Sequence, residues 1–192
     1  MSFKKGIVVS IDPSNALARV QFQDSDNVVS FWLHVGHKKT HLDKDYWMPD
    51  KGELVACVLD DNGEDGVIIC ALYSEEDTPP TASKDKWVKK FADGTVLEYD
   101  RGEHKLTADV KGAVKVAATG EIAVNAPTAV ITAEVTINGN TTINGNFVLN
   151  GNGTASGTLT ASDMQSDNGI SLISHIHSGV QTGGSNTGQP NS

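Results

Sequence analysis

Apolar and polar residues alternate along most of the chain, but they do so differently in its two halves. In the first 80 residues the alternation comes in short runs, such as KGIVVSID, LARVQF and VVSFWLHV, separated by polar turns. Two later runs, LVACVLD and GVIICALY, flank the acidic, glycine-containing segment DDNGEDG, a composition that favours a hairpin. Five strands in residues 1–80 predict a small all-β barrel of the OB type.

A change of composition follows the predicted barrel. The segment SEEDTPPTASKD is charged and contains a proline pair, which marks a boundary. The next segment, KWVKKFADGTVLEYD, predicts two strands that meet at Asp93 and Gly94. Residues 81–104 are therefore interpreted as a linker and the hairpin that leads into the second half. The basic cluster KDKWVKK is expected to be only a solvated face.

From residue 105 to residue 173 the alternation is long and regular. Period two over such a length indicates strands rather than helix. A six-residue repeat of an apolar residue followed by Asn-Gly-Asn recurs at Ile137, Ile143 and Leu149, and short periods of this kind predict a β-helix or solenoid. The apolar or small residues occupy even positions before Pro127 and odd positions after it: Leu106, Ala108, Val110, Val114, Val116, Ala118, Ile122, Val124, Ala126, and then Ala129, Ile131, Ala133, Val135, Ile137, Ile143, Phe147 and Leu149.

These inward positions are mostly Val, Ile, Ala and Gly, which suits a very narrow core. One copy of this half would expose strand edges and a thin apolar stripe, and both features promote aggregation. Three intertwined copies would remove both. The sequence therefore predicts a homotrimer of about 61 kDa, three times the 20.3 kDa of one chain, whose residues 105–173 form a triple-stranded β-helix.

Two histidines two positions apart, His175 and His177, lie in the final segment, residues 174–192. In an extended chain these side chains point to the same side, so both can face the axis of a threefold shaft. Three chains would then supply six imidazoles in two rings. We expect a metal-capped apex that binds iron(II), with nickel or cobalt as alternatives, rather than tetrahedral zinc.

Charge and the remaining candidate residues exclude several other functions. The net charge of −9 argues against a nucleic-acid partner, because phosphate binding requires clustered Lys and Arg. The sequence offers no secretory signal and no apolar run long enough for a membrane-spanning helix. Cys57 and Cys70 are expected to be buried thiols of a reducing compartment. Two other groups are expected to bind no metal, namely the histidines His34, His37 and His41 and the acids Asp60, Asp61, Glu64 and Asp65.

The FADGTVLEYD segment and the terminal HIHSGVQTGGSNTGQP resemble the baseplate spike proteins of contractile-tailed bacteriophages and R-type pyocins, often called baseplate assembly protein V. The resemblance covers nearly the whole chain. It implies that His175 and His177 of three subunits hold one buried Fe²⁺ ion per trimer through six His, and that the spike is driven through the bacterial outer membrane when the tail sheath contracts. The chain has no lysozyme-like insertion between barrel and β-helix, so we expect no cell-wall digestion.

The resulting hypothesis is mechanical: a structural, non-enzymatic, membrane-piercing tail spike. The barrel is expected to dock on the tail hub of a virion or pyocin particle that is assembled in the bacterial cytoplasm. One alternative is a tail-associated trimeric β-helix that binds or depolymerises polysaccharide. That function needs paired carboxylates in an exposed groove, and beyond Glu121 the chain offers only Glu134, Asp163 and Asp167. The other alternative is a spike component of a type VI secretion system.

Overall fold

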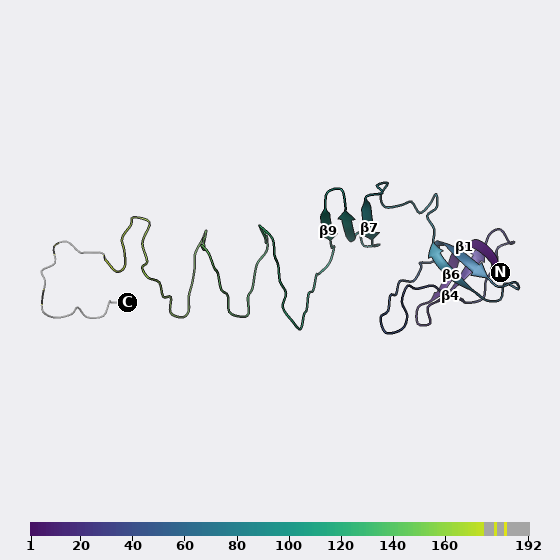
Figure 1. Ribbon diagram of the computed structural model, residues 1–192, viewed down its shortest axis with the longest axis horizontal. Coiled ribbons are helices and arrows are strands. Elements are labelled where there is room, and N and C mark those ends of the chain that lie inside the picture. The colour runs from purple at the N-terminus through teal and green to yellow at the C-terminus, as the bar shows by residue number, and fades with distance from the viewer. Residues whose placement is uncertain (175–178, 180–182, 184–192) are drawn as a thin grey trace. The chain divides into compact units, whose positions relative to one another are not determined.

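The chain is all-β, as the sequence analysis predicted (Figure 1). The computed structural model describes residues 1–174, 179 and 183, and these divide into two parts, Met1–Ala123 and Val124–Ser192. The regular elements of the described residues are all strands: β1 Ser2–Asp12, β2 Leu17–Phe22, β3 Val28–Val29, β4 Leu33–Val35, β5 Leu54–Leu59, β6 Gly66–Ala71, β7 Lys86–Lys90, β8 Val96–Asp100 and β9 Lys105–Asp109. The described part of the chain offers no helix of the length and apolarity that a membrane crossing requires.

A closed barrel occupies the first part of the chain. Its sheet runs β1-β5-β6-β4-β2, and β2 pairs with β1 to complete the ring. The long strand β1 makes this possible because its first half, residues 2–7, pairs with β5 while its second half, residues 7–12, pairs with β2. Gly6 lies at this change of partner, where a Cβ atom would fall 2.5 Å from the carbonyl oxygen of Gln21. The close approach of β1 and β2 therefore requires a glycine at this position.

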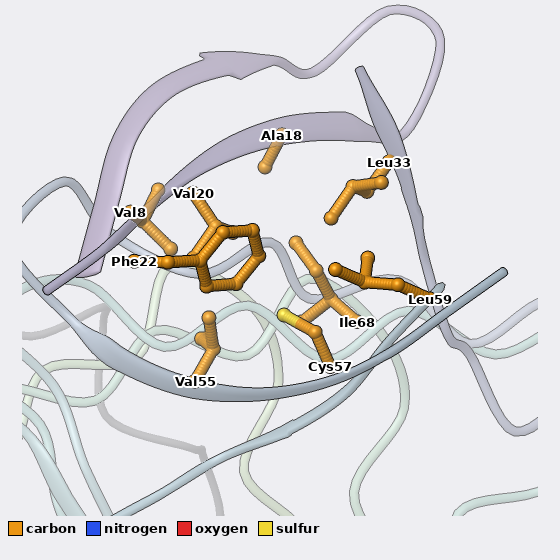
Figure 2. Close-up of a cluster of buried hydrophobic side chains, with 9 residues drawn as sticks. All are labelled: Val8, Ala18, Val20, Phe22, Leu33, Val55, Cys57, Leu59 and Ile68. Atoms are coloured by element: carbon orange, nitrogen blue, oxygen red, sulfur yellow. The ribbon is translucent and has the colours of Figure 1, made fainter. Parts of the chain in front are cut away.

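The barrel interior is filled by apolar side chains from the barrel strands (Figure 2). Alternation is clearest in β2, where Ala18, Val20 and Phe22 are buried and the residues between them are half-buried. The buried set is Val8, Ala18, Val20, Phe22, Leu33, Val55, Cys57, Leu59 and Ile68. Period-two patterning thus builds one contiguous core, as expected for strands with one face inside.

The run VVSFWLHV, predicted as one strand, is divided into β3 and β4. Ser30 is the cause. Its buried hydroxyl accepts a hydrogen bond from the Val20 amide at 2.9 Å and donates one to the Phe31 carbonyl at 2.6 Å. The Ser30 hydroxyl therefore takes the place of a backbone carbonyl as the hydrogen-bond partner of the Val20 amide. The next two residues, Phe31 and Trp32, are both exposed.

The prediction that both cysteines are buried was wrong for one of them. Cys57 lies in the barrel core, whereas Cys70 near the end of β6 is exposed, and both are free thiols. Burial raises the pKa of the Cys57 thiol to about 11.

The hairpin predicted around Asp93 and Gly94 is confirmed, and it gains a third strand. β7 pairs with β8, and β8 pairs with β9, which was expected to begin the shaft. Gly94 adopts a φ of 88° in the tight turn, and the Thr95 amide donates to the Asp93 carboxylate at 2.8 Å. Most of the basic cluster KDKWVKK lies in strand β7, where none of its side chains is fully buried and Lys86 forms ion pairs with Glu98 at 2.8 Å and with Asp100 at 3.6 Å.

Residues 111–162 form no strand (Figure 1). All of them are exposed to solvent. Their apolar side chains are as exposed as their polar ones, for example Val116 at 71%, Ile131 at 73% and Phe147 at 70%. A single copy of this segment thus buries none of its apolar stripe.

Candidate functional site

A small turn structure lies immediately before the histidine pair. Gln165 and Ser171 form an isolated antiparallel bridge. Within this turn the Ser166 amide donates to the Ile170 carbonyl at 3.0 Å, and Gly169 closes the bend with a φ of 76°. The Leu172 amide then donates to the Met164 carbonyl at 2.9 Å. The segment therefore folds back on itself through its own backbone hydrogen bonds.

Asp163 and Ser171 connect the two ends of this turn. Ser171 is buried, and its hydroxyl oxygen accepts hydrogen bonds from the amides of Ile173 at 3.1 Å and Ser174 at 3.0 Å. A hydrogen bond from the Ser171 side chain, with further ones from the Ile173 amide and from Gln165, holds the pKa of the Asp163 carboxyl below its ordinary value. Asp163 therefore accepts hydrogen bonds that connect the two ends of the turn.

The predicted metal ligands His175 and His177 lie outside the described residues. Their binding of a metal stays a prediction. The described turn ends at Ser174, directly before the first of them, so the chain reaches the histidine pair from a segment with local hydrogen-bonded structure.

The other histidines lie on the first part of the chain. His34 is on β4, and His37 stacks on the ring of Tyr46 with 5.4 Å between ring centroids. The Nε2 atom of His37 is buried without a hydrogen-bond partner. Among residues 1–174, 179 and 183, no three His, Cys, Asp or Glu side chains gather in a way that could hold a metal ion.

One contact that the sequence analysis did not predict joins the barrel to the three-stranded sheet. Trp47 lies in the loop between β4 and β5, and its ring meets the ring of Phe91 edge-on at 5.5 Å. The Lys89 ammonium lies 4.0 Å from the centroid of the same Trp47 ring. The sequence signal was the enrichment of aromatic residues before residue 100, but it did not identify which rings meet.

Comparison with known proteins gives two matches. A family model described as the GpV Apex motif matches residues 169–191, which include the turn at Gly169 and both His175 and His177. The spike protein of Escherichia phage P2 is 27% identical over 126 residues. That alignment covers 65% of this chain and 58% of the phage protein, so the chain spans little more than half the length of this relative. Both matches agree with the resemblance found in the sequence, and they support an assignment to the baseplate spike family.

Proposed function

We propose that this chain is a homotrimeric, membrane-piercing spike at the tip of a contractile tail. The observation that carries the proposal is the exposure of residues 111–162. In one copy of the chain these residues form no strand, and their alternating apolar side chains are exposed to solvent. Apolar surface on this scale marks an interaction site, and a period-two stripe fits other strands. Intertwining of residues 105–173 from three copies as a β-helix would bury the stripe and pair the strand edges.

The proposed mechanism is transmission of axial force. A prism whose strand edges are all paired has no edge at which it can open under load. Beyond Lys115 the chain carries no Lys or Arg, and its only acids are Glu121, Glu134, Asp163 and Asp167. Few charges would need to be desolvated during a brief passage through the host outer membrane, which lowers the cost of that passage. This role requires no catalytic residue.

At the apex, His175 and His177 of three chains would supply six imidazole donors to one Fe²⁺ ion. Neutral imidazole suits iron among the transition metals, so the donor set fits. When bound, the ion would cross-link the three chain ends and stabilise the folded tip, because binding to the native state alone favours that state. The turn at Asp163 to Ser174 would lead each chain into this site.

The barrel would serve as the attachment domain of the spike. Its single parallel pair, β4 with β6, gives the ring the non-sequential strand order of a Greek-key barrel, which supports an OB-type fold. Exposed aromatic residues on it, including Phe31 and Trp32, offer contact surface for a tail hub protein. The chain would accordingly reside in the tail baseplate of the particle, with no nucleic-acid partner.

Metal analysis and particle imaging test the proposal together. Purified full-length protein is expected to contain close to one iron per three chains, and His175→Ala with His177→Ala should abolish it. The matched control is His34→Ala with His41→Ala, which should leave the iron content unchanged. Electron tomography of the particle should locate the chain below the tail tube. Metal-free wild-type protein would refute the metal site, and a location away from the tail tip, or turnover of glycans, would refute the spike.

A further inference from the structure

A groove opens on the barrel between β3 and the loop that joins β5 to β6. Its volume is about 470 Å³. Two residues of the barrel core, Phe22 and Leu59, line it, and so do three apolar residues in or beside β3 whose side chains are exposed: Val28, Val29 and Phe31. Residues 60–64 of the loop line it as well. The groove therefore offers apolar surface that is continuous with the core.

The groove lies where the barrel wall lacks a strand pair. β4 pairs with β6 in parallel, beginning with His34 opposite Val67. β3 precedes β4 on the same side of β2, but the residues that precede β6 form the β5–β6 loop. β3 therefore has no strand beside it at this point, and it is the edge of its sheet.

The backbone of this edge strand is open to pairing. The Ser30 amide donates to the Val20 carbonyl at 2.8 Å, so the backbone of Ser30 faces β2. Hydrogen bonding alternates along an antiparallel ladder, and the amide and carbonyl of Val29 consequently point away from β2. Among the strands that the structure describes, none lies opposite these two groups. An exposed edge of this kind is a template for pairing with another chain.

The loop side of the groove is acidic. Asp60, Asp61 and Glu64 line it. Asp60 accepts a hydrogen bond from the Glu64 amide at 2.9 Å, and Asp61 contacts the amino group of Met1. The Glu64 carboxylate forms no ion pair within the described part of the chain. Glu64 is therefore available to a cation from outside the chain.

Lys4 also lines the groove, but its ammonium is already engaged. It donates a hydrogen bond to the Ser25 hydroxyl and lies 5.4 Å from the centroid of the Phe22 ring. The charge that remains for a partner is negative, so the complementary partner is basic.

From these features we infer that the groove binds an extended segment of a partner protein in which lysine or arginine alternates with small apolar residues. The segment would pair with β3 as an added strand, with its apolar side chains against Phe22 and Leu59 and a cation at Glu64. The inference rests on the proposed role of the barrel as the attachment domain and adds the chemistry of the partner.

The chain itself does not supply a suitable occupant. It contains no Lys or Arg after Lys115, so its distal part cannot complement the acidic loop. A second copy, with a net charge of −9, would meet like-charge repulsion at this loop.

Peptide binding to the full-length protein tests the charge of the occupant. The probe is a fluorescein-labelled heptapeptide of alternating lysine and valine, and the control peptide has glutamate in place of lysine. Fluorescence anisotropy should show binding of the lysine peptide only. Glu64→Lys should weaken this binding about fivefold or more, whereas Glu76→Lys, an equal charge change outside the groove, should change it less than about twofold. Equal affinities of the two variants, or no binding of the lysine peptide to wild type, would overturn the inference.

Hydrogen exchange tests the edge pairing separately from the charge. Saturating lysine peptide should slow amide exchange in residues 28–32 and leave exchange in β7 unchanged. Val29→Pro removes the outward amide without removing a bond to β2, so this variant should fold and bind the peptide about threefold or more weakly. Unaltered exchange in residues 28–32 of peptide-bound wild type would overturn the inference. Neither measurement depends on the mass or iron content of the protein, so a negative result removes the docking groove and leaves the spike proposal to its own tests.

Discussion

The contact between Trp47 and Lys89 predicts an energetic coupling between the barrel and the three-stranded sheet. An ammonium above an indole contributes about 0.5–1 kcal/mol at an exposed site. An edge-on aromatic pair contributes about 0.5–1.5 kcal/mol beyond its buried area. Trp47 makes both contacts, with Lys89 at 4.0 Å and Phe91 at 5.5 Å, and it is 57% exposed. Trp47→Ala should therefore lower the free energy of unfolding by about 1–2.5 kcal/mol.

A double-mutant cycle isolates the cation contribution. Trp47→Ala, Lys89→Met and the double variant are compared with wild type by urea unfolding at fixed protein concentration, with far-ultraviolet circular dichroism as the signal. We expect a coupling free energy of about 0.5–1 kcal/mol. Lys90→Met is the matched control, because Lys90 is the next residue and shows no ring contact within the described residues. A coupling below about 0.3 kcal/mol, or equal coupling for Lys90, would refute the contact as a stabilising junction.

Three further predictions concern the barrel, the thiols and the turn. Gly6→Ala should destabilise the barrel by about 1–3 kcal/mol in thermal unfolding. Gly112→Ala is the control and should not destabilise it, because a Cβ added at Gly112 meets no atom within 4 Å. Equal effects of the two substitutions would contradict the account of barrel closure. In native protein at neutral pH, iodoacetamide should modify Cys70 but not the buried Cys57, and rapid modification of both would contradict the core. The hydrogen bonds that lower the pKa of Asp163 stabilise the turn when the pH is above the ordinary aspartate pKa, and this stabilisation is lost as the pH falls through the lowered pKa. NMR titration of Asp163 should give a midpoint below 3.8, and a midpoint at or above 3.8 would contradict the account.

Much of the barrel was predictable because its strands bury one face, and burial imposes a period of two on the sequence. The β5–β6 hairpin and the turn at Gly94 were found in the same way, since acidic or Asp-Gly segments separate apolar runs. The division of VVSFWLHV was not predictable, because it depends on the Ser30 hydroxyl bonding the Val20 amide of the adjacent strand β2. Serine is compatible with a continuous strand, and the sequence does not reveal its partner.

The metal-binding role of the candidate site stays a prediction, because its two histidines lie outside the described residues. His175 and His177 were identified from their spacing and from a resemblance that the apex motif at residues 169–191 supports. The turn around Ser171 was not foreseen, because it is made mostly by backbone and short polar side chains that leave no hydrophobic pattern. The distal stripe is exposed in one copy of the chain, and alternation alone does not reveal what covers it.

The most direct test of the central claim is the mass of the full-length protein in dilute buffer, measured by light scattering coupled to size exclusion. The account predicts a single species of about 61 kDa, three times the 20.3-kDa chain. The double variant His175→Ala with His177→Ala should have the same mass. In the proposed trimer, residues 105–173 make most of the contacts between chains, and the metal site makes only a few. A folded species of 20.3 kDa with its distal stripe exposed to solvent would contradict the account.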